Sequence, residues 1–285
     1  MNFNVNEDLK VIREMLELSQ EKMANELELD VKTINRIENG YNYPNADTIE
    51  KIYDYAYKHN IKLNNIKEMF YKEETTNKLL FHGTKTMIDG DITIEYGRDN
   101  SDFGKGFYCG ESIEQTISFI SRYPNSSFYI LSFDDKELKS TTFTVNQEWM
   151  LAVAYFRGKL NDYKDNPKLI KIVEKVKNVD YIYAPIADNR MFTIIDNFID
   201  GLITDEQCKH SLAATNLGNQ YVFLNDKATS RLQILERCYI SNLEREKYLE
   251  IKKTEVDDGD NKVKLAMIKY KNQGKYIEEI LKWEN

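Results

Sequence analysis

The sequence predicts an α+β protein with an all-helical bundle first, a domain of dispersed strands and helices next, and a helical C-terminal tail. Three observations lead to this prediction. Apolar residues recur at helical spacing through roughly the first seventy residues. From about residue 79, short aromatic and β-branched runs alternate with helical patterns. Strands dispersed among helices favour an α+β domain over a regular parallel α/β sheet.

Composition restricts the class of protein. The 285 residues are 41% hydrophobic and 12% aromatic, which supplies enough apolar surface for two packed domains. No run is as long as a membrane helix, and the first four residues open no secretory signal, so we expect a cytoplasmic protein without a membrane partner. The net charge of −8 argues against nonspecific binding to nucleic acid or membranes.

The cysteines and histidines favour free thiols and argue against a metal site. The cysteines are scattered and odd in number, as expected for a reducing compartment: Cys109, Cys208 and Cys238. The histidines are equally isolated: His59, His82 and His210. We therefore expect no metal cofactor.

Four helices are predicted in the first seventy residues. The first carries an apolar face formed by Leu9, Ile12, Leu16 and Leu18. Ser19 is a typical N-cap for the second, which ends near 28–30. The third covers 31–38 and stops at Asn39-Gly40, and the fourth starts near 45–47.

This helix order, with Leu18-Ser19-Gln20-Glu21 and Ile37-Glu38-Asn39-Gly40 at the turns, resembles the phage-repressor (Cro/C1, XRE-type) helix-turn-helix family over residues 6–70. The resemblance implies that the helix at 31–39 enters the major groove of DNA. Its candidates for contacting base edges are Lys32, Thr33, Asn35 and Arg36. A solvated structural helix would carry the same residues.

Charge leaves the partner of this module open. Residues 1–74 hold ten Lys and Arg against fifteen Asp and Glu, a net charge of −5. Phosphate contacts supply most nonspecific DNA affinity, so an acidic module starts at a disadvantage. Two partners stay open for this module. One is operator DNA, bound by a homodimer, and the other is a regulatory or antitoxin protein.

Beyond a polar linker at 73–78 the pattern changes from helices to mixed elements. The predicted strands lie at 79–81, 91–96, 107–109, 128–133, 181–185, 220–224 and 232–235. The predicted helices lie near 111–121, 147–157 and 168–177. The chain has neither a Rossmann fingerprint nor a P-loop.

The stretch Asp102-Phe103-Gly104-Lys105-Gly106-Phe107-Tyr108-Cys109 is the strongest candidate for a binding site. Glycine lets the backbone bend sharply or approach a ligand closely, because it lacks a Cβ. A ligand there would find Tyr108 as a stacking face and His82, in Phe81-His82-Gly83-Thr84, as a hydrogen-bonding partner. Taken alone, the glycines also fit a plain β-bulge.

Phe81-His82-Gly83-Thr84, Gly104–Tyr108 and Asn219–Phe223 resemble, in this order, the three-motif signature of ADP-ribosyltransferases of the branch typified by diphtheria toxin and poly(ADP-ribose) polymerases. A bacterial family of this fold, catalogued as a domain of unknown function, is resembled more closely over roughly 78–240, through Asp102–Tyr108, 184–190 and Asn219–Phe223. The resemblance implies a split β-sheet that binds NAD as a substrate. The domains expected are 1–72 (helix-turn-helix), 79–240 (NAD-binding) and 241–285 (helical extension).

The resemblance also implies a role for each motif residue. His82 would bond an adenosine-ribose hydroxyl, the backbone of Gly83 would hold the nicotinamide amide, and Tyr108 would stack on the nicotinamide ring. The cations Lys105 and Arg190 are candidates for the pyrophosphate. The remaining expected NAD contacts are Thr84, Gly104 and Gly106. Singly, His82 also fits a core histidine, Tyr108 a strand aromatic, and the two cations a solvated surface.

The chain departs from the family at the third motif, where Gln220 stands in place of the usual Glu. An amide oxygen can accept the hydrogen bond of a ribose hydroxyl but contributes no negative charge. Polymer elongation is therefore not expected. Single ADP-ribose transfer, slow NAD hydrolysis and NAD binding without turnover stay open.

A replacement carboxylate could come from Asp188, Asp102 or Glu148. Asp188 is preferred because it follows the predicted strand at 181–186 directly, at a strand end where sites often form. A turn-forming aspartate would occupy the same position.

Residues 241–285 carry ten positive and ten negative side chains. They are predicted to form two helices split at Asp257-Asp258-Gly259-Asp260. Apolar residues such as Leu265, Ile268 and Trp283 fit a docked cap or an oligomer contact, whereas the charges fit a solvated helix pair.

The resulting prediction is a cytoplasmic, NAD-dependent mono-ADP-ribosyltransferase, acting as a toxin or phage-defence effector, with a helix-turn-helix module for DNA or a regulator. The acceptor of ADP-ribose, a protein, a nucleic acid or a small molecule, is unknown. The alternative is a non-catalytic transcription regulator that senses NAD or ADP-ribose. A scaffold without either activity is a third hypothesis.

Overall fold

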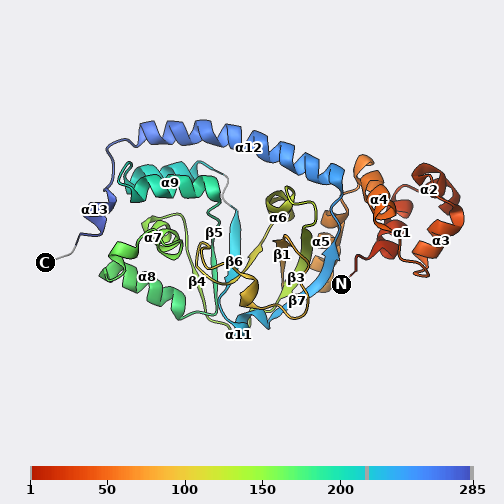
Figure 1. Cartoon of the computed structure of the whole chain (residues 1–285), viewed down its shortest axis with the longest axis horizontal. Coiled ribbons are helices and arrows are strands. Elements are labelled where there is room, and N and C mark those ends of the chain that lie inside the picture. Colours follow the sequence, from red (N-terminus) through yellow and green to blue (C-terminus); the bar gives the residue numbers. More distant parts are fainter. Residues whose placement is uncertain (1, 216–217, 283–285) are drawn as a thin grey trace. The chain divides into compact units, whose positions relative to one another are not determined.

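The computed structural model describes residues 2–215 and 218–282 and divides the chain into two compact units. Unit 1 comprises Met1–Asp89, Ile113–Phe133 and Gln233–Ile251, and unit 2 comprises Gly90–Ser112, Asp134–Leu232 and Lys252–Asn285. Figure 1 colours the chain by sequence, so the N-terminal bundle of unit 1 is red to orange. Each unit is described by itself. The α+β class predicted from the sequence is confirmed.

Five helices open unit 1: α1 (Val5–Met15), α2 (Gln20–Leu27), α3 (Val31–Glu38), α4 (Ala46–Lys58) and α5 (Leu63–Glu74). Side chains at their N-caps fix where three of them begin. Ser19 accepts from Lys22 N, Asp30 from Lys32 N, and Asn45 from Thr48 N. Gly40, with a φ of +68°, follows the last turn of α3. The predicted starts of the second, third and fourth helices are thereby confirmed.

The first helix ends earlier than predicted, at Met15. Glu17 adopts a left-handed φ of +54°, which a continuing helix cannot contain. Leu16 and Leu18 still pack against the bundle core from the turn between α1 and α2. Helix α5, which the sequence analysis did not predict, ends four residues before β1 begins.

Unit 1 also contains the strands β1 (Lys78–Thr84), β3 (Ser127–Phe133) and β7 (Leu232–Cys238), in the order β1-β3-β7, with helix α6 (Ile113–Ile120). Strands β1 and β3 are antiparallel, and Leu80 pairs with Leu131. Helix α6 packs closely on β1. A Cβ at Gly83 would lie only 2.7 Å from Cγ2 of Ile120. A glycine is therefore required at this crossing.

A buried ionic cluster connects the helical bundle of unit 1 to β7. Lys67 Nζ of α5 lies 2.7 Å from Asp8 Oδ2 of α1 and 2.6 Å from Glu236 Oε1 of β7. Tyr53 donates to the same Asp8 oxygen, and Tyr71 donates to Glu236 Oε2 over 3.1 Å. Two carboxylates buried with one ammonium are stable only while that ammonium stays in place.

Four strands of unit 2 lie in the order β4-β5-β6-β2. They are β2 (Phe107–Gly110), β4 (Ser140–Thr142), β5 (Tyr181–Pro185) and β6 (Asn219–Phe223). β5 is parallel to β4 and antiparallel to β6, and β6 is antiparallel to β2. The register places Gln220 opposite both Gly110 and Ala184.

Unit 2 contains α-helices and short 3₁₀ helices, and its core includes Trp149, Ile195 and Phe198. They are η1 (Ile94–Tyr96), α7 (Gln147–Phe156), η2 (Asn161–Tyr163), α8 (Pro167–Lys177), α9 (Asn189–Ile199), α10 (Asp205–Ala213), α11 (Asp226–Thr229) and α13 (Ile277–Ile280). The sequence analysis did not predict α9 and α10. Asp188 caps α9, and Thr204 with Gln207 forms a capping box at α10.

Two predicted elements are wrong. The strand expected at 91–96 is the short helix η1, because the Thr93 side chain accepts from Glu95 N and starts a tight turn. The helix break expected at 257–260 is absent, since α12 (Asn242–Lys269) is continuous. Gly259 leaves room for Arg190, whose Nη1 a Cβ would approach to 2.6 Å.

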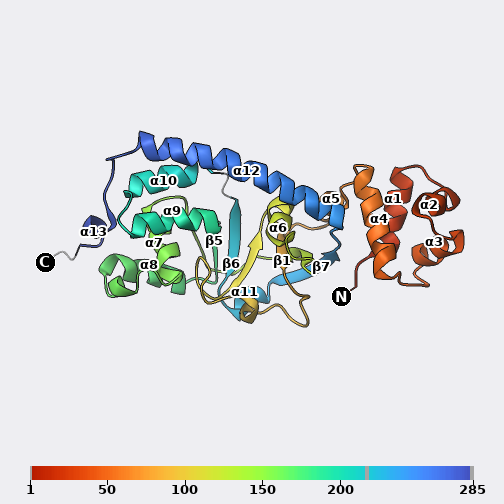
Figure 2. The same cartoon turned by 45° about the horizontal axis from the view of Figure 1, so that its top comes forward.

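Helix α12 belongs to unit 1 up to Ile251 and to unit 2 from Lys252. In unit 2 its last turns run beside α10, which Figure 2 shows: Gln207 Nε2 donates to Met267 O over 2.9 Å. The Tyr270 ring stacks on His210 just beyond the helix, with ring centroids 3.6 Å apart. Trp283, predicted to supply apolar surface, lies outside the described residues. Within residues 2–215 and 218–282, no helix combines the length and apolar character that crossing a membrane requires.

Candidate functional site

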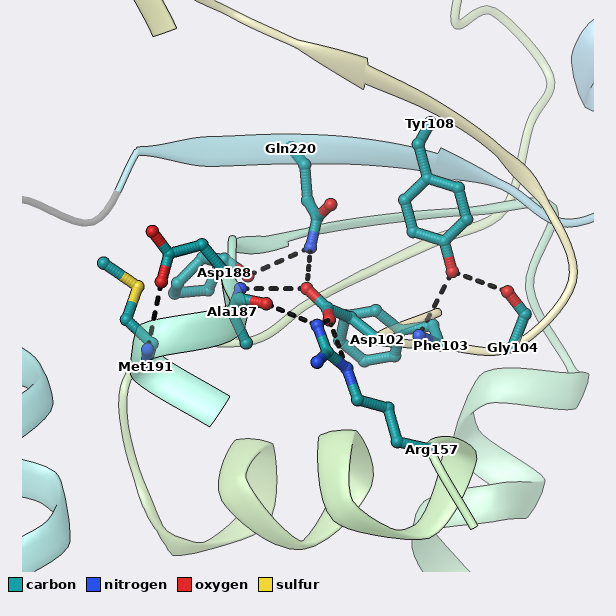
Figure 3. A network of polar contacts seen from close by, with 10 residues as sticks. Asp102, Phe103, Gly104, Tyr108, Arg157, Ala187, Asp188, Met191 and Gln220 are labelled. Atoms are coloured by element: carbon teal, nitrogen blue, oxygen red, sulfur yellow. Dashed lines mark hydrogen bonds and ion pairs between the residues drawn. The ribbon is translucent and has the colours of Figure 1, made fainter. Parts of the chain in front are cut away.

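The candidate site of unit 2 centres on the carboxylate of Asp102, which lies in the loop before β2 and is 4% exposed. Oδ1 accepts from Arg157, with Nε at 3.0 Å and Nη2 at 2.5 Å. Oδ2 accepts from Ala187 N at 2.9 Å and from Gln220 Nε2 at 2.8 Å. Figure 3 shows these partners converging from separate parts of the chain. A buried carboxylate needs such a set of donors, because its desolvation would otherwise be costly.

Arg157 supplies the compensating positive charge. It is the C-cap residue of α7, where the helix dipole favours a cation. Its Nη2 also donates to the carbonyl of Ala187, and its guanidinium lies 4.1 Å from the centroid of the Phe192 ring of α9. One arginine therefore holds the Asp102 loop, the segment after β5 and α9 together within unit 2.

The orientation of the Gln220 amide follows from its partners. The side chain is buried on β6, and its nitrogen faces Asp102 Oδ2 and, at 3.2 Å, the carbonyl of Pro185. Both partners are acceptors, so only the NH₂ group of the amide can face them. Oε1 consequently points away from the network, as Figure 3 shows.

Tyr108 of β2 is tied to the glycine-rich bend. Its hydroxyl donates to Gly104 O over 2.7 Å and accepts from Phe103 N over 3.2 Å. Gly104 has a φ of +76°, the left-handed region that favours glycine, so the bend depends on this residue. Gly106 adjoins β6, where a Cβ would lie 2.8 Å from Phe223 O. Burial and the nearby charge of Asp102 raise the pKa of the Tyr108 phenol.

Other charged residues expected at the site have separate partners in unit 2. Lys105 Nζ lies 2.5 Å from Glu95 Oε2. Arg190 Nη1 lies 3.0 Å from Val256 O and 3.4 Å from Asp260 Oδ1, on α12. Asp188 accepts from Met191 N as the N-cap of α9, and Glu148 pairs with Lys175 at 2.9 Å. Of the three carboxylates considered from the sequence, the structure brings Asp102 to Gln220.

The first motif lies in unit 1, on β1. His82 pairs with Tyr129 across the antiparallel register, and their rings are 6.5 Å apart. Gly83 lies under α6, and Thr84 pairs with Ser127 at the end of the strand. The Tyr129 hydroxyl accepts from Ile88 N over 2.9 Å, which fastens the segment after β1.

The DNA-contact candidates lie on α3 in unit 1. Lys32, Asn35 and Arg36 are exposed, and Thr33 is half-buried. Asn35 Nδ2 donates to Gln20 Oε1 over 3.2 Å, and Gln20 Nε2 donates to Glu38 Oε2 over 2.7 Å. Arg13 Nε of α1 completes the set, 2.6 Å from Glu38 Oε1. The buried Glu38 thus fixes α3 against α1 and α2.

Arg157 and Gln20 are functional candidates that the sequence analysis missed. Arg157 is the last residue of the helix predicted near 147–157, next to Gly158, where it resembles any helix-terminal cation. Gln20 follows the N-cap Ser19 directly, at the start of the second predicted helix. That position could have suggested that its side chain lies beside the third helix. Over residues 2–215 and 218–282, no group of three or more His, Cys, Asp and Glu side chains could hold a metal ion.

Comparison with family models produced two matches. Residues 78–234 match the family described as "Protein of unknown function (DUF3990)". Residues 9–54 match the helix-turn-helix family, a fold whose typical role is DNA binding. Searches of the curated proteins and of the solved structures found no match.

Proposed function

The chain belongs to the DUF3990 family of proteins of unknown function, whose model covers more than half of it, and we propose that this part is an NAD-dependent mono-ADP-ribosyltransferase. The fixed orientation of Gln220 is the observation that supports the proposal best. The nitrogen faces two acceptors, Asp102 and Pro185, so Oε1 is left to accept a hydrogen bond. The glutamate that usually occupies this position has two tasks, and accepting a hydrogen bond from the ribose hydroxyl is one of them.

The second task of that glutamate, negative charge near the developing oxocarbenium ion, is not met by an amide. Asp102 lies beside Gln220, but Arg157 compensates its charge. Catalysis would then depend on positioning: the glycosidic bond breaks, nicotinamide leaves with the electron pair, and one acceptor nucleophile attacks the ribose carbon. We therefore infer a slow enzyme that transfers a single ADP-ribose, with Tyr108 stacking on the nicotinamide.

We propose that the helix-turn-helix part binds operator DNA or a regulatory protein and thereby controls the transferase. The exposed side chains on α3 are Lys32, Asn35 and Arg36, with Thr33 half-buried beside them. A toxin or phage-defence effector under its own regulation is the setting we infer.

A regulator that binds NAD without cleaving it is the second candidate. It is favoured because each of the three carboxylates considered as replacements for glutamate already binds other groups of the protein. Asp102 accepts from Arg157, Ala187 and Gln220, Asp188 caps α9, and Glu148 pairs with Lys175.

Incubation of the full chain with NAD labelled on the adenylate phosphate, in cell extract, tests both candidates. Gln220→Met removes the acceptor oxygen with little change in volume. Gln147→Met is its matched control, because Gln147 Nε2 donates to Asp205 Oδ2 over 2.7 Å in the same unit but outside the motifs. Tyr108→Phe keeps the ring and loses the bonds to the glycine bend, whereas Tyr108→Ala loses both.

Transferase activity predicts label on a macromolecule in the wild type, Gln147→Met and Tyr108→Phe, and its loss in Gln220→Met and Tyr108→Ala. Nicotinamide release without labelled product would indicate hydrolysis. Intact NAD together with measurable NAD binding would refute the enzyme and support the regulator. Equal activity in Gln220→Met and Gln147→Met would remove the main support for the proposal.

A further inference from the structure

A row of aromatic rings crosses β5 and β6 of unit 2, on the face of the sheet opposite to Gln220. Successive side chains of a strand point to opposite faces, so Tyr221 lies on the other face from its neighbour Gln220. The register places Tyr183 opposite Tyr221, and Tyr181 opposite Phe223. The ring of Tyr221 lies 4.9 Å from that of Tyr183 and 6.1 Å from that of Tyr181. Tyr181 in turn lies 6.2 Å from Phe223, so the four rings form a continuous aromatic row.

The aromatic row becomes accessible toward one end. Phe223 is fully buried and Tyr181 is 7% exposed, whereas Tyr221 and Tyr183 are half-buried. The last two residues of the row therefore offer part of their surface to solvent. An aromatic ring carries negative potential on its face, and this potential attracts a cation.

A carboxylate stands at the accessible end of the aromatic row. Glu111, the residue after β2, is exposed, and its Oε2 accepts from the Tyr183 hydroxyl over 2.9 Å. Its Oε1 accepts from Asn219 Nδ2 over 2.8 Å. Burial and the hydrogen bond to Glu111 raise the pKa of Tyr183 to about 12, so the phenol keeps its proton at neutral pH. Both donors are neutral, and they fix the direction of the carboxylate without compensating its charge.

Glu111 has no cation of its own. Across residues 2–215 and 218–282, no Lys, Arg or His nitrogen lies within 4.0 Å of its carboxylate. Asp102 of the same unit, in contrast, pairs with Arg157. A carboxylate has about four accepting positions on its two oxygens, so the two hydrogen bonds of Glu111 leave positions for a further donor. Negative charge and open accepting positions thus meet beside the rings.

We propose that Glu111, Tyr183 and Tyr221 form a docking surface for an arginine side chain of a protein partner. A guanidinium suits both parts of this surface, because it donates two parallel hydrogen bonds to a carboxylate and stacks on aromatic faces. A lysine ammonium is a compact, strongly hydrated point charge without such a plane.

Two observations favour a basic protein segment over other occupants. Small ligands bind in concave pockets that bury most of their surface, whereas Glu111 is exposed and the two accessible rings are half-buried. An arginine carried by a protein partner gains further contacts around this open surface. The net charge of −8 repels the phosphates of a nucleic acid and attracts a basic segment. Because the surface lies on the face opposite to Gln220, the inference does not depend on the proposed transferase.

Fluorescence anisotropy of labelled peptides with the full chain tests the docking surface. The probes are peptides that alternate glycine with arginine, with citrulline or with lysine; citrulline keeps the shape of arginine but carries no charge. Glu111→Gln removes the carboxylate, and Tyr221→Leu removes one ring. Glu174→Gln is the matched control, since Glu174 is an exposed glutamate of α8 in the same unit. A circular dichroism spectrum of each variant establishes that it is folded.

We expect the wild type to bind the arginine peptide about 10-fold more tightly than the citrulline peptide. Glu111→Gln should weaken the arginine peptide by about 10- to 100-fold and leave the citrulline peptide unchanged. Tyr221→Leu should cost about 2- to 5-fold, the range of one exposed cation–π contact. Glu174→Gln should match the wild type, and the affinity for the arginine peptide should fall as salt rises.

Several results would overturn the docking surface. Equal affinity for the arginine and citrulline peptides would show that no guanidinium is recognised. Equal losses in Glu111→Gln and Glu174→Gln would show attraction to the overall negative charge alone. A lysine peptide that binds as tightly as the arginine peptide would refute the choice of arginine. If a single-stranded oligonucleotide binds in a Glu111-dependent way and the arginine peptide does not, the partner is a nucleic acid and the proposal is wrong.

Discussion

The side-chain nitrogen of Gln220 lies 2.8 Å from Oδ2 of Asp102, two residues that are 118 positions apart in the sequence. The contact explains why an amide suits the position where related motifs carry glutamate. A glutamate would place two carboxylates face to face in a buried network, whereas the amide donates to one acceptor and keeps its own oxygen outside it.

Gln220→Glu is expected to lower the free energy of unfolding by about 3 kcal/mol at pH 8, because it leaves two close buried carboxylates. One of the pair would take up a proton as the pH falls, since a neighbouring like charge raises the pKa of a carboxyl. The loss should therefore shrink toward pH 5. Urea denaturation at both pH values measures it. Gln220→Met serves as control, with a loss of about 1–2 kcal/mol at either pH; identical behaviour of the two variants would contradict the prediction.

Arg157→Met is expected to cost about 3–5 kcal/mol of unfolding free energy, because it leaves the Asp102 carboxylate buried without its cation. Adding Asp102→Asn should recover part of that cost, since an uncharged amide needs no compensating charge. Denaturation of the two single variants and the double variant gives the coupling between them. Additive losses would show that the two side chains do not act as a pair.

Lys67→Met is expected to cost about 3–5 kcal/mol near pH 7, because Asp8 and Glu236 would keep two buried carboxylates without a cation. Burial alone would lower the pKa of Lys67, but the charges of Asp8 and Glu236 raise it above its ordinary value. Its contribution is therefore complete below the unfolded pKa of about 10.4 and is lost as the pH rises further. Above a pH of about 10.4, melting temperatures should fall more steeply in wild type than in Lys67→Met; parallel curves in that range would refute this.

Glu244→Gln is expected to stabilise the protein at pH 8 and to leave its stability nearly unchanged at pH 5. Burial raises the pKa of Glu244 to about 7. A carboxyl with a raised folded pKa loses stability as the pH rises from its unfolded value through 7, and the substitution removes that loss. We expect a gain of about 1–3 kcal/mol at pH 8 by urea denaturation. An equal gain at pH 5 would point to a different cause.

Arg36→Ala is expected to weaken binding to a duplex selected from a random library with the full chain. The loss should be about 5- to 150-fold, the range of one base contact by an arginine. Fluorescence anisotropy measures it. Lys51→Ala, an exposed lysine of α4, is the matched control. If both variants bind like wild type, α3 does not contact DNA.

Much of the fold could be predicted from the sequence wherever short-range contacts decide it. The caps Ser19, Asp30 and Asn45 accept from backbone groups two or three residues away, so their sequence neighbours suffice. β5 was predicted with its observed bounds, Tyr181–Pro185, because a run of β-branched and aromatic residues precedes a proline. The prediction of a strand at 91–96 was wrong, because the Thr93 side chain caps a short helix there in spite of the apparent alternation of apolar and polar residues.

The predicted break in α12 was wrong because a long-range contact outweighs the local sequence. Asp257-Asp258-Gly259-Asp260 is a poor helical sequence by local propensity, and glycine alone costs a helix about 1 kcal/mol relative to alanine. The absent side chain of Gly259 admits Arg190, whose guanidinium bonds Val256 O and Asp260 of the same helix. A contact across 66 residues thus decides a local conformation.

The sequence by itself determined the helical module, the order of the three motifs and the residue types at each of them. Only the tertiary structure decided which side chains meet: Asp102 rather than Asp188 lies beside Gln220, and Arg157 compensates its charge. Lys105 and Arg190, expected at the pyrophosphate, pair with Glu95 and Asp260 instead. The cations of Lys85 and Arg122 both lie over the ring of Tyr123. The physical reason is range, because caps and periodicity act within a few residues, whereas a buried charge takes its partners from whatever elements the packing brings to it.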